Sequence, residues 1–296
     1  MTGDWKAANQ TRETSPGVPA RWTLELQSVA RMAVGFLVFR HGMEQVLGFP
    51  AAGTEVPTAS LYGALKALCL PGGLLLMLGL LTRPTTLALA IAHVAYWFIE
   101  PLPQAVFEGA RLFGSRGAPS DHLLLPGLFC AYLFFAGAGA WSVDRWMSRD
   151  TGAGSNAQAA MYALVILRIV AGFLFIPHGL GKISPTLDPM SLRAFAMVLE
   201  LVGGPMIILG LYVRPLAFLL CGEMAFAYFM SHAPSGFWGS FAEPNQEAAI
   251  LFCFLFLFFW AKGAGAWSLD AVLQRRRERS AGAPYRRRQR RRALAQ

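Results

Sequence analysis

Eight long apolar segments are the feature that most constrains how this chain can fold. They cover residues 24–43, 61–82, 84–100, 121–137, 160–181, 191–211, 215–232 and 246–262. About 20 predominantly apolar residues let an α-helix cross the hydrocarbon core of a bilayer, and several segments reach this length. Charged residues make up only 15% of the chain, whereas roughly 25% is usual in soluble domains. Because so little polar surface could cover this many core helices, we predict an integral membrane protein.

The apolar segments are expected to be helices. Lipid offers no hydrogen-bond partners to the backbone, so only α-helices and closed β-barrels span a membrane. A barrel strand would show roughly ten residues of alternating apolar and polar character, and the segments do not alternate. The predicted fold class is therefore an all-α integral membrane protein with eight transmembrane helices.

The sequence also contains an internal repeat. The octapeptide GAGAWSVD ends at Asp144, and GAGAWSLD ends at Asp270. Before them, PGGLLLMLGLLTRP aligns with VGGPMIILGLYVRP, and residues 31–42 align with residues 168–179. The shared order indicates a duplicated unit of four helices, and two such units insert with the same orientation as a parallel repeat. Their glycines are predicted to let neighbouring helices approach closely.

The repeat and the charge pattern divide the chain into four regions. These are a polar cytoplasmic lead (1–23), a first unit with degenerate motifs (24–150), a second unit with its motifs kept (151–273) and an Arg-rich cytoplasmic tail (274–296). The tail alone accounts for the net charge of +9. The arginine cluster at 275–292 favours anionic lipid headgroups as its partner over nucleic acid, because it follows a membrane helix. Basic residues favour the cytoplasmic side, so both termini are predicted to lie there, in a multi-pass protein of the cell membrane.

Ionisable residues inside spans are candidate functional residues, because burying them in lipid is costly. In the second unit they are Arg168, His178, Lys182, Glu200 and Glu223. Arg168 lies at nearly the same depth as the two glutamates, so we predict an ion pair between it and Glu200 or Glu223. A structural salt bridge, a proton-handling carboxylate and a site for an anionic or quinone ligand are the alternatives for this layer.

The first unit differs at the corresponding positions. It keeps the arginine and the histidine but lacks the lysine and both glutamates. The residues at the five corresponding positions, in chain order, are Arg31, His41, Gln45, Cys69 and Ala92. We therefore expect the second unit to carry the functional residues and the first unit to be mainly structural.

Cofactor motifs are scarce in this sequence. No cysteines are spaced as CxxC, and neither a glycine-rich dinucleotide loop nor a metal-ligand spacing occurs. Cysteines within spans are typically small apolar fillers. Four histidines lie near span ends: His41, His122, His178 and His232. They could offer haem ligands, but no spacing within a helix supports this. We predict neither haem nor a metal, and a quinone is the cofactor left open.

Three motifs of the second unit resemble the DoxX family, namely RIVAGFLFIPHGLGK, LELVGGPMIILGLYVRP and GAGAWSLD. The resemblance covers nearly all of 160–273 and, more loosely, 25–150. It implies a four-helix membrane unit, present here in tandem. The octapeptide is expected to close each unit, with its tryptophan at the cytoplasmic interface and its Ser-Val-Asp or Ser-Leu-Asp starting a short surface helix.

The resemblance also implies a function. Relatives include a membrane subunit of thiosulfate:quinone oxidoreductase, and others are proposed to link thiol or sulfur handling to superoxide defence. By this analogy the chain is expected to be a subunit or scaffold of a membrane redox complex with partner proteins, without a catalytic motif of its own. Two other hypotheses remain: a small-solute or proton-coupled transporter, and a structural assembly factor without a ligand.

Overall fold

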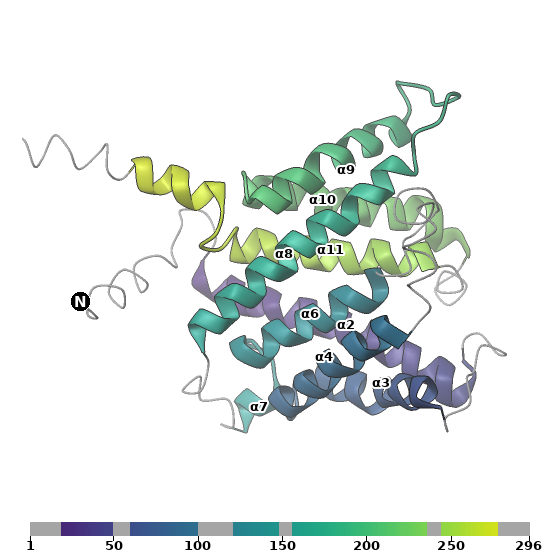
Figure 1. The fold of residues 1–296 in the computed structure, drawn as a ribbon, viewed down its shortest axis with the longest axis vertical. Helices are drawn as coiled ribbons and strands as arrows, with labels where there is room; N and C mark the ends of the chain where they lie inside the picture. The colour runs from purple at the N-terminus through teal and green to yellow at the C-terminus, as the bar shows by residue number, and fades with distance from the viewer. Residues whose placement is uncertain (1–18, 50–59, 100–120, 148–155, 236–243, 278–296) are drawn as a thin grey trace, which may run out of the picture.

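The computed structural model describes residues 19–49, 60–99, 121–147, 156–235 and 244–277. Within these ranges every predicted apolar segment falls on a helix, and no strand occurs. The long helices, shown in Figure 1, are α2 (Ala20–Leu47), α3 (Leu61–Leu78), α4 (Thr82–Ile99), α6 (Asp121–Ala136), α8 (Ala157–Leu180), α9 (Leu192–Leu209), α10 (Val213–Ala227) and α11 (Pro244–Lys262).

Three helices are long and apolar enough to cross a membrane, judged by length and composition. They are Ala157–Leu180, Leu192–Leu209 and Val213–Ser231. The all-helical fold and these spans confirm the predicted class of helical membrane protein. The other described helices fall outside this criterion, so the eight-span topology stays a prediction.

The two halves of the chain pack together in one helical bundle (Figure 1). In the first half α3 packs between α2 and α4, and α4 also contacts α6. In the second half α9 packs between α8 and α10, and α10 also contacts α11. Between the halves α6 packs against α8, and α11 packs against α2. The last helix of each half therefore contacts the first helix of the other half.

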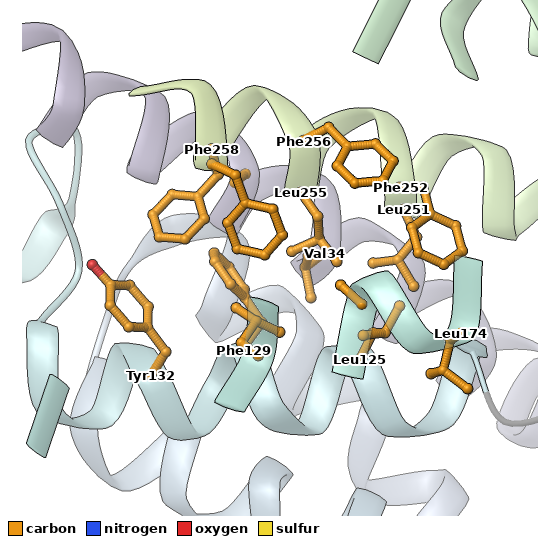
Figure 2. Close-up of a cluster of buried hydrophobic side chains, with 14 of the residues drawn as sticks. Val34, Leu125, Phe129, Tyr132, Leu174, Leu251, Phe252, Leu255, Phe256 and Phe258 are labelled. Carbon is orange, nitrogen blue, oxygen red and sulfur yellow. The ribbon is translucent and has the colours of Figure 1, made fainter. Parts of the chain in front are cut away.

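An aromatic core joins the halves (Figure 2). The buried ring of Phe258 on α11 meets Phe129 and Tyr132 of α6 edge-on, with ring centroids 5.4 Å and 5.1 Å apart. Farther along α11, Phe252 packs against Phe175 of α8 at 5.0 Å. Such aromatic pairs contribute to stability beyond the effect of the apolar area that they bury. Because α11 contacts α2, α6 and α10, it lies at the centre of this packing.

Glycines set the close approach of α2 to α3 and of α8 to α9. A Cβ atom on Gly35 would lie 2.8 Å from the backbone nitrogen of Met77, and one on Gly172 would lie 2.7 Å from the carbonyl oxygen of Gly204. Any larger residue there would force the two backbones apart. Within the glycine-rich stretches, a Cβ atom on Gly73 would overlap the backbone nitrogen of Phe39, so the packing role predicted for them is confirmed at this contact.

The bundle has two chemically different ends. We call the end with the tight turns after Gly79 and Gly210 the turn end, and the opposite end the loop end. At the turn end, Ser142 caps the short helix α7 (Val143–Trp146), and Ser268 caps helical residues 269–277. The predicted surface helices after each octapeptide are thus confirmed.

Candidate functional site

Arg168 is fully buried, and its guanidinium points to the turn end. Nη1 donates hydrogen bonds to the carbonyl oxygens of Ile207 and Ile208, at 2.7 Å and 3.1 Å. Nη2 donates to the carbonyl of Trp267 in the octapeptide, at 2.6 Å. The side chain therefore joins the last turn of α9 to the octapeptide.

The predicted ion pair between Arg168 and Glu200 or Glu223 is wrong. Among the described side chains, Arg168 lies within salt-bridge distance of neither carboxylate. The last carbonyls of a helix lack intrahelical partners, so they accept hydrogen bonds from a guanidinium that reaches them. Depth along the helix axis did not decide the contact, because the long side chain carries its charge well away from its own backbone.

Arg31 repeats this arrangement in the first half. Its Nη1 donates to the carbonyl of Met77 at 2.8 Å, its Nε donates to that of Ala138 at 2.9 Å, and its Nη2 donates to that of Trp141. Arg31 is also fully buried. The two arginines therefore perform the same structural task, and neither belongs to the polar site at the loop end.

The aspartate that closes each octapeptide fixes the adjacent turn. Asp270 accepts hydrogen bonds from the backbone N–H groups of Tyr212 and Val213, at 2.8 Å and 3.0 Å. Asp144 does the same for Leu81 at 2.8 Å. Leu81 and Tyr212 both have a φ of +50°, a left-handed conformation that is unfavourable for such residues. The octapeptide thus stabilises a strained turn between two helices.

The candidate functional site lies at the loop end of the second half. We call it the lysine cluster, and it consists of His178, Lys182, Glu200 and Glu223. Lys182 Nζ lies 2.6 Å from Glu200 Oε1 and 2.5 Å from Oε2, and it also donates to the carbonyl of His178 at 3.3 Å. The side chain of Glu200 is 2% exposed and that of Lys182 is 27% exposed. The ion pair therefore has one partner inside the bundle and one at its edge.

Glu223 adds a second carboxylate to the lysine cluster. Both of its carboxylate oxygens are buried and have no hydrogen-bond partner in the described structure. It interacts electrostatically with Glu200 and Lys182, and Glu200 also interacts with His178. If Glu200 and Glu223 were both ionised, their combined negative charge would exceed the single positive charge of Lys182. Because an unpaired buried charge is costly, the cluster requires a proton or another cationic group.

The ring of Phe252 and an irregular end of α10 border the lysine cluster. The ring of His178 packs edge-on against Phe252, with centroids 5.5 Å apart. After Glu223, α10 continues as a π-helix, Tyr228–His232, and then as a 3₁₀ turn, Ala233–Ser235. π-helical turns are rare and frequently occur at functional sites.

A second charged group lies at the loop end, across the contact between α2 and α11. We call it the arginine cluster, and it consists of Arg40, His41 and Glu44 of α2 with Glu247 of α11. Arg40 Nη1 lies 2.7 Å from Glu44 Oε1, and Nη2 forms an ion pair with Glu247. His41 Nε2 lies 3.0 Å from Glu247 Oε2. Arg40 and Glu247 are almost fully buried.

Comparison of the repeats points to His41 but misses Arg40, Glu44 and Glu247. The first half lacks counterparts of Lys182 and Glu200, which predicts few buried charged groups there. It nevertheless contains buried charged groups at other positions. Arg40, His41 and Glu44 are three ionisable groups at the end of an apolar segment, and this density could have indicated the site. Glu247 belongs to the other half, so no local pattern pairs it with them.

Two other candidates of the first half, Gln45 and Cys69, are also buried. Gln45 lies next to Glu44 of the arginine cluster on α2. Cys69 is buried and its thiol contacts the carbonyl of Leu65 in its own helix at 3.7 Å. Among the described side chains, no three His, Cys, Asp or Glu residues are placed to hold a metal ion. His122 and His232 have side chains outside the described part of the structure.

Comparison with known proteins supports the resemblance of the second half. The sequence model of the DoxX family matches residues 163–233, a segment that contains the whole lysine cluster. An uncharacterized protein of Haemophilus influenzae strain Rd is 44% identical over 123 residues, which represent 37% of this chain and 89% of that relative. No solved structure matches the chain. By the match to the family model and the similarity to this relative, the chain belongs to the DoxX family.

Proposed function

We propose that this protein is a membrane subunit or scaffold of a redox complex, and that its lysine cluster binds the head group of a quinone. The observation that carries the proposal is the partly buried Lys182–Glu200 pair beside the Glu223 carboxylate, which has no hydrogen-bond partner among the described residues. Ligand sites are typically apolar, with a few polar groups that fix orientation. The Phe252 ring beside His178 and the four polar side chains of the lysine cluster are groups of these kinds.

The chemistry of a quinone suits these residues. Its carbonyl oxygens accept hydrogen bonds, which the ammonium of Lys182 or the imidazole of His178 can donate. Reduction to the quinol consumes two electrons and two protons, and a carboxylate without a fixed partner, such as Glu223, can hold and transfer a proton. The electrons would come from a partner protein, as in the quinone-linked relatives that the DoxX resemblance suggests.

We also propose that all the long helices cross the membrane as two parallel units of four, with both termini in the cytoplasm. The recurrence of the same helix contacts and of the Arg31 and Arg168 arrangements in the two halves supports this topology. The arginines at 275–292 would then lie beside anionic lipid headgroups. A reporter protein that is active only in the cytoplasm tests the orientation when fused after Gln296.

The test of function is native mass spectrometry of the protein extracted from its own membrane. We expect a bound quinone or a redox partner with the natural chain, and a loss of the quinone in Lys182→Met and Glu200→Gln. Lys66→Met is the matched control, because Lys66 also lies at the loop end but outside both clusters. Recovery of the natural protein alone, with neither quinone nor partner, would count against the proposal.

Proton-coupled transport is the second candidate, and the excess carboxylate of the lysine cluster is the observation that favours it. Against it, α8 and α9 are continuous helices, and α10 departs from α-helical geometry only near its loop end. Solute uptake into vesicles that depends on a proton gradient and is lost in Glu223→Gln would support transport. A purely structural role predicts instead that Glu200→Gln and His178→Ala change stability alone.

A further inference from the structure

Two cysteines that lie far apart in the sequence are in contact in the structure. Cys221 on α10 and Cys253 on α11 have their sulfur atoms 3.7 Å apart, and no disulfide joins them. The two sulfurs of a disulfide lie about 2.05 Å apart. The two sulfurs already lie in contact across the packed helices α10 and α11, so disulfide formation requires them to approach by less than about 2 Å.

The pair lies at the middle of the bundle's depth. Cys221 follows the start of α10 at Val213 by about 12 Å along the helix, and Cys253 precedes the end of α11 at Lys262 by about 14 Å, at about 1.5 Å per residue. Both distances start from the turn end, so the residues share one level. In a hydrocarbon core about 30 Å thick, this level is close to the bilayer centre.

Partial exposure distinguishes these cysteines from the other two. Cys221 and Cys253 are half-buried, whereas Cys130 has no exposed surface and Cys69 has very little. In the membrane topology proposed above, the exposed part of a side chain at this level faces lipid. An oxidant dissolved in the bilayer can therefore reach Cys221 and Cys253, and an oxidant dissolved in water cannot.

We infer that Cys221 and Cys253 form a redox-active dithiol that a membrane quinone oxidises. The two S–H bonds break and one S–S bond forms. Both electrons and both protons pass to the quinone, which leaves as the quinol. The inference rests on the proposed function for its oxidant, and it adds a two-electron carrier within this chain to that function.

The experiment counts free thiols in the full-length protein. The protein is reduced, reconstituted in vesicles and incubated without oxygen with decylubiquinone, and is then denatured and labelled with N-ethylmaleimide for intact mass. The chain has four free cysteines, so four labels are expected before incubation. Afterwards we expect two labels, on Cys69 and Cys130, and about one quinol formed per chain.

Single substitutions identify the reacting pair. Cys221→Ser and Cys253→Ser should each keep every remaining thiol, while Cys69→Ser and Cys130→Ser should still lose two. Oxidised glutathione, which does not enter the bilayer, should leave all four thiols free. The inference is overturned if quinone leaves four labels, if the loss persists in Cys253→Ser, or if glutathione oxidises the pair as completely as the quinone does. Four labels would mean that the sulfurs only make a packing contact.

Quinone retention, measured in parallel, separates this inference from the proposed function. Quinone bound by the natural protein and lost in Glu200→Gln, with all four thiols kept, overturns the dithiol and leaves the proposed function standing. Thiol loss that persists in Glu200→Gln, with no quinone retained by either protein, supports the dithiol and counts against the lysine cluster as the quinone site.

Discussion

Arg168 and Arg31 are fully buried, and among the described side chains neither has a carboxylate within salt-bridge distance, although Asp270 and Asp144 interact with them electrostatically. Each donates to several backbone carbonyls at the turn end, where two segments of its own half meet. The carbonyl end of a helix carries a partial negative charge, which favours a cation there. The arginines therefore stabilise the bundle by satisfying acceptors that lipid cannot satisfy.

Replacing Arg168 tests this role. Arg168→Leu leaves the carbonyls of Ile207 and Trp267 without this donor, and we expect a loss of about 1–3 kcal/mol in the free energy of unfolding, the usual cost of unsatisfied buried polar groups. The measurement is thermal unfolding in detergent, followed by circular dichroism. Arg193→Leu is the control, since Arg193 is exposed at the loop end. Equal midpoints for the two variants would contradict the assigned role.

The turn between α9 and α10 depends on several residues acting together. Gly210 ends α9 with a φ of +67°, a conformation that glycine adopts readily. A Cβ atom there would overlap Nη1 of Arg168 and Cβ of Ser268. Asp270 meanwhile caps the first N–H groups of the next helix. The turn between α9 and α10 is therefore fixed by backbone conformation, side-chain packing and hydrogen bonding together.

Two glycine substitutions separate conformation from packing space. Gly210→Ala should lower the midpoint of thermal unfolding, because the new methyl group meets both strain and overlap. Gly222→Ala, on the neighbouring helix α10, should leave the midpoint unchanged or raise it. A Cβ there meets no atom within 4 Å, and alanine is favoured over glycine in a helix by roughly 0.5–1 kcal/mol. Gly222→Ala having the larger destabilising effect would show that the turn is not the constraint.

At the scale of the molecule, the two halves are joined by an apolar core and by a buried charged contact between α2 and α11. Phe129, Tyr132 and Phe258 form the apolar contact between α6 and α11. Arg40 and Glu247 form an ion pair between α2 and α11. The apolar contact supplies area, and the ion pair fixes which surfaces meet, because a shifted contact would leave a buried charge alone.

A double-mutant cycle tests whether this ion pair couples the halves. Glu247→Gln should lower the free energy of unfolding by about 1–3 kcal/mol, the range for a buried group that loses its partner. In an Arg40→Met background the same change should cost less, because Arg40, one of the partners of Glu247, is already absent while His41 remains. Asp188→Asn, an exposed change in the loop after α8, serves as the control. Additive effects of the two substitutions would mean that no coupling exists.

Local properties of the sequence determined the helices and the turns. Apolar length located the long helices that the structure describes, because backbone groups in lipid must be satisfied within their own segment. The octapeptides marked the two places where the chain closes a turn, since serine caps and aspartate hydrogen bonds act over short distances. The sequence also named Lys182 and Glu200 as site residues, because ionisable groups in apolar segments need a reason to be there.

The tertiary structure alone decided which of these side chains meet. Lys182 rather than Arg168 pairs with Glu200, because the rotation of α8 and the reach of the arginine carry the guanidinium to the turn end. Arg40 meets Glu247, and Cys221 meets Cys253, only because α11 packs against α2 and α10. Periodicity and depth describe one helix at a time. The partner of a buried group depends on how helices are rotated and packed against each other, and no single segment encodes that.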